Sequence, residues 1–397
     1  MKKIRNKIML TMMVLTLLPA ILIGAYSFHS TSEALRENAL IDQRNKLVQS
    51  QQVIQSTALR VESDLLFLRD SSAMQLYLAA KKSSAKRSRV LLTNLRNSVQ
   101  QFVQQQQIYS AARFLDLSGK EQVRIEIFDK IASSLDKKSE LISRSKRDYF
   151  KETLGLRSNQ IYISPLELRK NGAEPVKPYQ STIRYSTIVR DASGSRQGVL
   201  ILNLNTDDLI DRIASNESTK WITAFTDPDG FYYYHPDEAK RWSGPSNLNT
   251  QKNIFDDKQL GLVAVKASKK AVTSENDSML TLSTPIVLGE NRPALGYLFS
   301  LSPKNQLFKP LRDYLTVSLI IASVSLFLSL IFAAMLANSL SRPLVELKDR
   351  VERLSRGDLE TPVESLNKNE IGDLSRAVEL LRKSMNILMS RSGKPKV

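Results

Sequence analysis

The run from Tyr314 to Leu336 limits the folds open to this chain most, because about 23 residues pass without a charge. A helix of that length crosses a hydrocarbon core of about 30 Å. A second apolar run, from Ile8 to Phe28, is about 20 residues long and lacks a small-residue cleavage site. We therefore predict a membrane anchor there rather than a cleaved signal peptide. The sequence predicts a two-pass membrane protein.

Basic residues set the expected orientation. Residues 1–7 carry four Lys or Arg and no acid, and a basic segment from Arg342 to Arg356 follows the second run. Positive loops stay inside, so we expect both termini in the cytoplasm and residues 29–313 outside a bacterial inner membrane.

The formal net charge is +17, and about ten of these charges fall in the extracytoplasmic stretch, where they favour anionic ligands or surfaces. A merely solvated basic face is the alternative. Nucleic acid is not an expected partner.

The composition argues against catalysis. The chain has no Cys and two His, so we expect no metal site and no cofactor. It also lacks a phosphate-binding glycine loop and a Ser/His/Asp arrangement, and we expect no enzyme. For His235 we predict a structural role in a turn, with ligand or pH sensing as the alternative.

Two short helices with apolar seams are expected after the second span. Their seams predict a dimeric, parallel four-helix bundle. The first seam has Leu344, Leu347, Val351 and Leu354, and the second has Ile371, Leu374, Val378, Leu381, Met385 and Leu388.

At these residues the chain resembles a HAMP domain, the linker of bacterial transmembrane receptors. The resemblance rests on Pro343 opening the first helix, Gly357-Asp358-Leu359 closing it, and Glu370-Ile371-Gly372 opening the second. It implies a HAMP domain over residues 337–389 and a short basic tail over 390–397. Kinase, cyclase or methyl-accepting domains follow in the family, so we expect either a separate cytoplasmic effector or an output domain absent from this sequence.

A long stalk helix is predicted after the first span, in a helical region over residues 29–108. No Pro or Gly occurs from Thr31 to Ala79, and one stripe repeats every seven residues. Self-association and packing against the chain's own following domain are equally good uses of that stripe, which comprises Leu40, Leu47, Ile54, Val61 and Leu68. A second helix is predicted from Arg87 to Gln107.

Strand patterns then recur twice, each time as a strand pair, a helical excursion and three strands. The modules are expected over residues 109–205 (membrane-distal) and 206–313 (membrane-proximal). The predicted strands are Ala112–Leu117, Gln122–Phe128, Gln160–Ser164, Thr182–Val189 and Gly198–Asn203, then Ile222–Thr226, Phe231–Tyr234, Gly261–Lys266, Met279–Pro285 and Ala294–Leu301.

This order resembles the double Cache sensor ectodomain. The residues that carry the likeness are Arg113 to Glu121, Arg147-Asp148-Tyr149-Phe150, Ile161 to Pro165, Gly198-Val199-Leu200, and Asp227 to Phe231 with His235-Pro236. The resemblance implies an α+β membrane protein with a stalk helix, two PAS-like modules with antiparallel sheets, two transmembrane helices and the HAMP bundle.

In that family the distal module holds a small-molecule ligand. By resemblance, the pocket comprises Arg144, Arg147, Asp148, Tyr149, Tyr162, Ser164, Tyr179, Arg184 and Asn203. A guanidinium holds a carboxylate through two parallel hydrogen bonds, which makes Arg147 beside Tyr149 the best-placed pair.

Amino-acid-binding members carry an Arg-x-Trp-Tyr run, an earlier Tyr and an acid on the last strand. Here Arg147-x-Tyr149-Phe150, Ile142 and Asn203 stand at those places. We therefore expect a small carboxylate or other anion. The alternative is that these residues pair with Asp148, Glu152 or Glu167 and only build structure.

The predicted function is a homodimeric transmembrane receptor that senses an extracytoplasmic ligand, in signal transduction or chemotaxis. Two alternatives stay open: a fragment of a larger kinase, cyclase or chemoreceptor, and a non-signalling subunit that binds an envelope protein.

Overall fold

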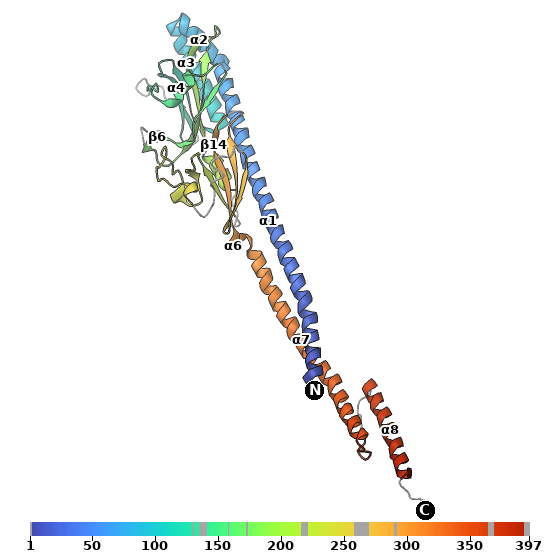
Figure 1. Cartoon of the computed structure of the whole chain (residues 1–397). Coiled ribbons are helices and arrows are strands. Elements are labelled where there is room, and N and C mark those ends of the chain that lie inside the picture. Colours follow the sequence, from blue (N-terminus) through green and yellow to red (C-terminus); the bar gives the residue numbers. More distant parts are fainter. Residues whose placement is uncertain are drawn as a thin grey trace, which may run out of the picture. The chain divides into compact units, whose positions relative to one another are not determined.

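The computed structural model describes residues 2–128, 131–134, 141–157, 159–171, 174–215, 221–257, 270–289, 292–363 and 369–392. The chain divides into two units, residues 36–307 and residues 1–35 with 308–397. Figure 1 shows their helices and strands.

Helix α1 (Lys2–Asp70) is uninterrupted, as the absence of Gly and Pro from Thr31 onward predicts. Ser71 ends it by capping α2 (Ser72–Ser83), and Ser84 caps α3 (Ala85–Gln106); each hydroxyl accepts a backbone N–H. The predicted second helix is confirmed.

The membrane-distal module contains one antiparallel sheet, whose strands differ in length. Its strand order is β3-β2-β1-β9-β8-β4, and β5 also pairs with β8. The strands are β1 (Tyr109–Asp116), β2 (Glu121–Phe128), β3 (Ile131–Ser134), β4 (Ile161–Ile163), β5 (Glu167–Leu168), β8 (Ser181–Arg190) and β9 (Arg196–Asn205). A small hairpin of β6 (Lys170–Asn171) and β7 (Glu174–Pro175) and one short helix, α4 (Asp148–Leu154), complete the module.

The membrane-proximal module repeats this plan after α5 (Asp207–Ala214). Its sheet has the order β11-β10-β14-β13-β12. The strands are β10 (Ile222–Thr226), β11 (Tyr232–Tyr234), β12 (Val272–Glu275), β13 (Met279–Val287) and β14 (Ala294–Pro303). Two short 3₁₀ turns, η1 (Glu238–Lys240) and η2 (Ile254–Asp256), lie between β11 and β12. The strand predicted at Gly261–Lys266 lies outside the described residues.

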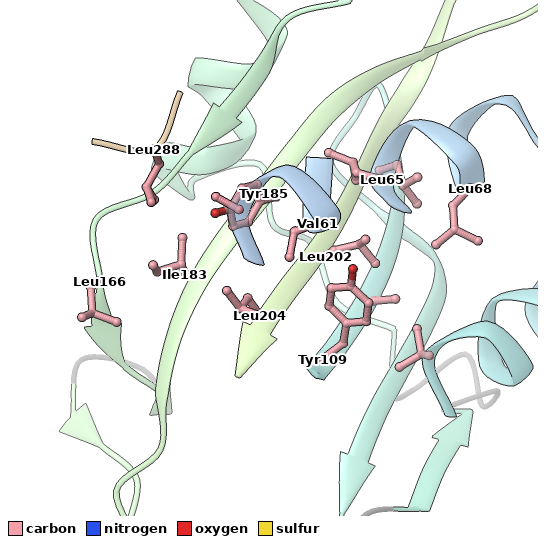
Figure 2. Packing of buried hydrophobic residues seen from close by; sticks show 14 of the residues in the cluster. Val61, Leu65, Leu68, Tyr109, Leu166, Ile183, Tyr185, Leu202, Leu204 and Leu288 are labelled. Atoms are coloured by element: carbon pink, nitrogen blue, oxygen red, sulfur yellow. The ribbon is translucent and has the colours of Figure 1, made fainter. Parts of the chain in front are cut away.

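Helix α1 uses its seven-residue stripe to pack on the sheets of its own chain. Leu47, Ile54, Val61 and Leu68 are all buried in one cluster that includes residues of both sheets. Figure 2 shows Val61 and Leu65 beside Tyr185 and Leu202. Burial of each such side chain stabilises the fold by about 1.5–3 kcal/mol. Of the two uses predicted for the stripe, the structure therefore shows core packing.

The unit of residues 1–35 and 308–397 contains α7 (Lys309–Ser355) and α8 (Glu370–Ser392). Helix α7 and the apolar start of α1 are each long and apolar enough to cross a membrane. We predicted that Pro343 opens a helix, and this is wrong: Pro343 lies inside α7. Its fixed φ is helical and only one backbone hydrogen bond is lost, so the helix continues through it.

The other features of the predicted relay are present. Gly357 follows α7 with a φ of 98°, a conformation that favours glycine, and α8 begins at Glu370. A backbone contact joins the connector to α8, because Glu379 accepts from the Val363 N–H at 2.7 Å. Leu347, Leu354 and Ile371 are buried, Val378 is half-buried, and Leu344, Val351, Leu374 and Leu381 are exposed.

Candidate functional site

A cavity of about 780 Å³ lies over the distal sheet. Its lining comes from β1, β2, β8 and β9, from the segment before α4, and from the residues around β4 to β7. Basic side chains outnumber acidic ones. The basic residues are Arg113, Arg124, Arg144, Arg147, Arg169, Lys170 and Arg184, and the acidic ones are Glu126, Asp148 and Glu167.

Eight of the nine predicted pocket residues line this cavity. They are Arg144, Arg147, Asp148, Tyr149, Tyr162, Ser164, Arg184 and Asn203. Tyr179 is the exception, because it does not line this cavity. It is 41% exposed, with Lys177 Nζ 5.6 Å from its ring centre. The segment before β8 has no strand period to direct that side chain inward.

One row of residues across the sheet forms part of the floor. In the antiparallel register, Asn203 of β9 lies opposite Ala111 of β1 on one side and Arg184 of β8 on the other. Directly opposed residues point to the same face. Thr182, two residues before Arg184, also lines the cavity.

An ionic network that sequence reasoning missed supports the floor. The Glu126 carboxylate accepts hydrogen bonds from Arg113 at 2.8 Å, Arg124 at 2.8 Å and Arg169 at 3.0 Å. Burial alone would raise the pKa of Glu126, but these guanidinium groups outweigh burial and hold it below its ordinary value. The available signal was the presence of charged residues on both strands of the β1–β2 hairpin, Arg113 on β1 and Glu121, Arg124 and Glu126 on β2.

Two of the predicted arginines are held by local acids. Arg144 Nε donates to Glu121 Oε1 at 2.9 Å, and Glu121 is almost completely buried. Arg184 pairs with Glu167 and lies 5.6 Å from the centre of the Tyr149 ring. Arg184 thus pairs with one of the acids that the structural alternative named, whereas Arg144 pairs with Glu121, which it did not name, and both arginines line the cavity.

Arg147 differs from them. It is exposed and caps α4, where its carbonyl accepts from the N–H groups of Phe150 and Lys151. Its guanidinium makes no hydrogen bond or ion pair with any residue that the structure describes. Nearby, burial, Glu152 and Asp148 raise the pKa of Tyr162, which keeps that phenol a hydrogen-bond donor. An uncompensated cation beside neutral phenols suits an anionic ligand.

The proximal module contributes structure at its aromatic cluster. Trp221, Tyr232, Tyr233, Tyr234 and Trp242 are buried, and Phe231 is half-buried. A second cavity of about 780 Å³ lies between the modules, lined mostly by apolar residues of α1, of β4 and its flanking segments, and of β14 and the segment before it. It shares Tyr162, Ser164 and Pro165 with the distal cavity.

Two family models match the chain. The model described as bacterial histidine kinase, sensor domain, matches residues 37–281, and the HAMP domain model matches residues 335–386. The predicted sensor ectodomain followed by a HAMP domain is therefore confirmed.

Two curated proteins of Bacillus subtilis (strain 168) are similar over part of their length. Sensor histidine kinase CssS is 29% identical over 246 residues, which cover 62% of this chain and 46% of CssS. The methyl-accepting chemotaxis protein McpC is 26% identical over 162 residues, which cover 41% of this chain and 23% of McpC. The chain thus spans less than half the length of each of these relatives.

Solved structures share the fold. The extracellular domain of vpHK1S-Z8, described as a histidine kinase, matches with a TM-score of 0.55 and 26% identity, covering 72% of this chain and 96% of that domain. A domain of a sensory box/GGDEF family protein from Vibrio parahaemolyticus gives a TM-score of 0.56 at 24% identity, covering 70% and 99%.

Proposed function

Because the chain belongs to the family of bacterial histidine kinase sensor domains, and a HAMP domain follows, we propose that it is a transmembrane receptor for a small anion. The observation that supports this most is the guanidinium of Arg147, which has no partner among the described residues and stands in a cavity whose charged lining residues are predominantly basic. The cavity's volume of about 780 Å³ lies within the range of small-molecule sites.

A carboxylate or other anion suits this cavity better than a free amino acid. Asn203 stands where amino-acid-binding sensors carry an acid, and a neutral amide is a weaker partner for an ammonium group than a carboxylate. Asp148 also lines the cavity, but it is exposed beside Arg147 and Lys146.

We further propose that the receptor is a homodimer in a bacterial inner membrane, with residues 29–313 outside and both termini in the cytoplasm.

Ligand binding would shift the equilibrium between two packings of α7 and the HAMP helices. A ligand shifts such a balance only by its differential affinity for the two states, and a change from 1:99 to 99:1 needs about 5.5 kcal/mol. In this proposal the described residues bind and relay, and a cytoplasmic effector carries out the chemistry. A kinase or chemotaxis-type effector would agree with the kinds of relatives found.

The test replaces Arg147 by Ala in the full chain, reconstituted in lipid nanodiscs, with succinate as the probe. Loss of a charge-assisted pair should weaken binding by about tenfold to a hundredfold in calorimetry. Arg147→Lys keeps the charge but loses the two-pronged geometry, so an intermediate affinity is expected.

Arg157→Ala is the matched control, because Arg157 is exposed in the distal module but does not line the cavity. It should leave succinate binding unchanged. Equal affinities of wild type and Arg147→Ala would remove Arg147 from the site.

A further inference from the structure

Two polar side chains on the cavity floor have unpaired atoms. Asn203 is 7% exposed and Thr182 is 2% exposed. Asn203 Oδ1 and Thr182 Oγ1 are both buried, and neither has a hydrogen-bond partner among the described residues. Such an unpaired buried group costs about 1–3 kcal/mol. Both residues line the cavity, so a ligand there could supply the missing partner.

The neighbours of Asn203 in the sheet do not supply this partner. Asn203 has Ala111 as its direct neighbour on β1, and a methyl group covers little of the floor. On the other side its neighbour is Arg184, whose guanidinium already pairs with Glu167. The missing partner must therefore come from the cavity side.

The charges around the floor select the kind of partner. The Glu126 carboxylate is already paired with three arginines, and the Glu167 carboxylate is paired with Arg184. An ammonium group would thus meet an uncharged amide and hydroxyl beside the cation of Arg184. A hydroxyl group can donate to Asn203 Oδ1 and accept from a neighbouring donor, without adding positive charge.

We propose that the ligand is a hydroxycarboxylate, whose hydroxyl group pairs with Asn203 and Thr182 while its carboxylate is held by Arg147. This rests on the proposed function, since it assigns the uncharged end of the same anion. The site would thus distinguish ligands by a single hydroxyl group.

Three probes of one carbon skeleton test this: succinate, L-malate with an added hydroxyl, and L-aspartate with an added ammonium. Calorimetry on the full chain in nanodiscs should give L-malate an affinity roughly tenfold above that of succinate, as expected for one hydrogen bond to otherwise unpaired groups. L-aspartate should bind more weakly than L-malate.

Variants locate the preference. Asn203→Ala should reduce the malate-to-succinate ratio to near one while succinate still binds, and Thr182→Val should reduce it in part. Asn203→Asp places a carboxylate at the floor and should shift preference from L-malate towards L-aspartate. Asn94→Ala, at an exposed position of α3 outside the cavity, should keep the wild-type ratio. Thermal unfolding without ligand shows which variants fold. If Asn203→Ala does not fold, the nearly isosteric variants Asn203→Asp and Thr182→Val provide the test.

The two proposals can fail separately. Equal binding of succinate and L-malate to wild type would overturn the hydroxycarboxylate assignment and leave the anion receptor intact. A wild-type malate-to-succinate ratio in Thr182→Val, or a wild-type malate-to-aspartate ratio in Asn203→Asp, would also overturn it. Binding of none of the three probes would overturn both.

Discussion

At the scale of single residues, His235 shows how burial affects a titrating group. It follows β11 in a turn, where its Nδ1 accepts the N–H of Asp237 at 3.0 Å. Burial, and then the nearby charge of Lys240, lower the pKa of His235 from 6.5 to about 4. The folded state therefore favours the neutral imidazole, in agreement with the structural role predicted for it.

The stability of this module should depend on pH through His235. Because its pKa is lower when folded, the unfolded chain binds the proton more tightly, and stability is lost as pH falls from 6.5 towards 4. The loss is up to about 3 kcal/mol, at 1.36 kcal/mol per pKa unit. His235→Asn keeps a hydrogen-bond acceptor and does not titrate, so it should flatten this dependence.

Urea titrations read by fluorescence measure the effect, since both Trp residues, Trp221 and Trp242, lie buried in the same module. His29→Asn, on an exposed part of α1, is the control and should keep the wild-type slope. A wild-type slope in His235→Asn would contradict the prediction.

Local sequence carried enough information to place some of the expected residues at the cavity. Arg147, Tyr149 and Tyr162 belong to short motifs, and they line the cavity. Glu126 was missed because its role depends on the register that places it opposite Ala111 and within reach of Arg169, 43 positions along the chain. Such a register cannot be read from one strand alone.

At the scale of elements, the contact between α1 and the proximal sheet contains a polar defect. Gln43 of α1 is completely buried and its Nε2 donates to Ser302 of β14. Gln43 Oε1 and Ser300 Oγ have no partner among the described residues. The position lies four residues before Leu47, on the face of α1 that is buried against the sheets.

Gln43→Leu should stabilise this unit by about 1 kcal/mol, because removing an unpaired buried carbonyl and adding apolar contact outweigh one lost hydrogen bond. Thermal unfolding of the full chain in nanodiscs measures it. Gln52→Leu, on an exposed position of the same helix, should change stability by less than about 0.5 kcal/mol. Destabilisation by Gln43→Leu would mean that the hydrogen bond between Gln43 and Ser302 stabilises the fold by more than the unpaired Gln43 Oε1 costs.

Element predictions failed where a neighbour decides the outcome. Strand β3 was not predicted, since four residues acquire strand structure only by pairing with β2. Pro343 indicated a helix start, yet the span before it carries the helix through. The positions of most strands along the chain, by contrast, follow from alternation and turns.

At the scale of the whole molecule, the HAMP seams should join two chains. Leu381 is 56% exposed on α8 although it belongs to the apolar seam, and a parallel partner would cover it. Because the chain has no Cys, Leu381→Cys provides one unique thiol, and mild oxidation in membranes should give a disulfide-linked dimer.

Lys383→Cys is the control, since Lys383 is also exposed but lies on the outer face of the expected bundle. It should cross-link much less. Equal cross-linking at both positions, or none at Leu381→Cys, would contradict a parallel dimer with this seam.

The three arginines that share Glu126 affect how readily a bound anion dissociates from the receptor. An entering anion meets guanidinium groups that already have an internal counter-ion, so part of their attraction is offset before binding begins. Although Arg147 has no partner among the described residues, such a site releases its ligand more readily than one in which none of the guanidinium groups has a counter-ion. The occupancy of the site can then follow both a rise and a fall in the ligand concentration, as reversible sensing requires.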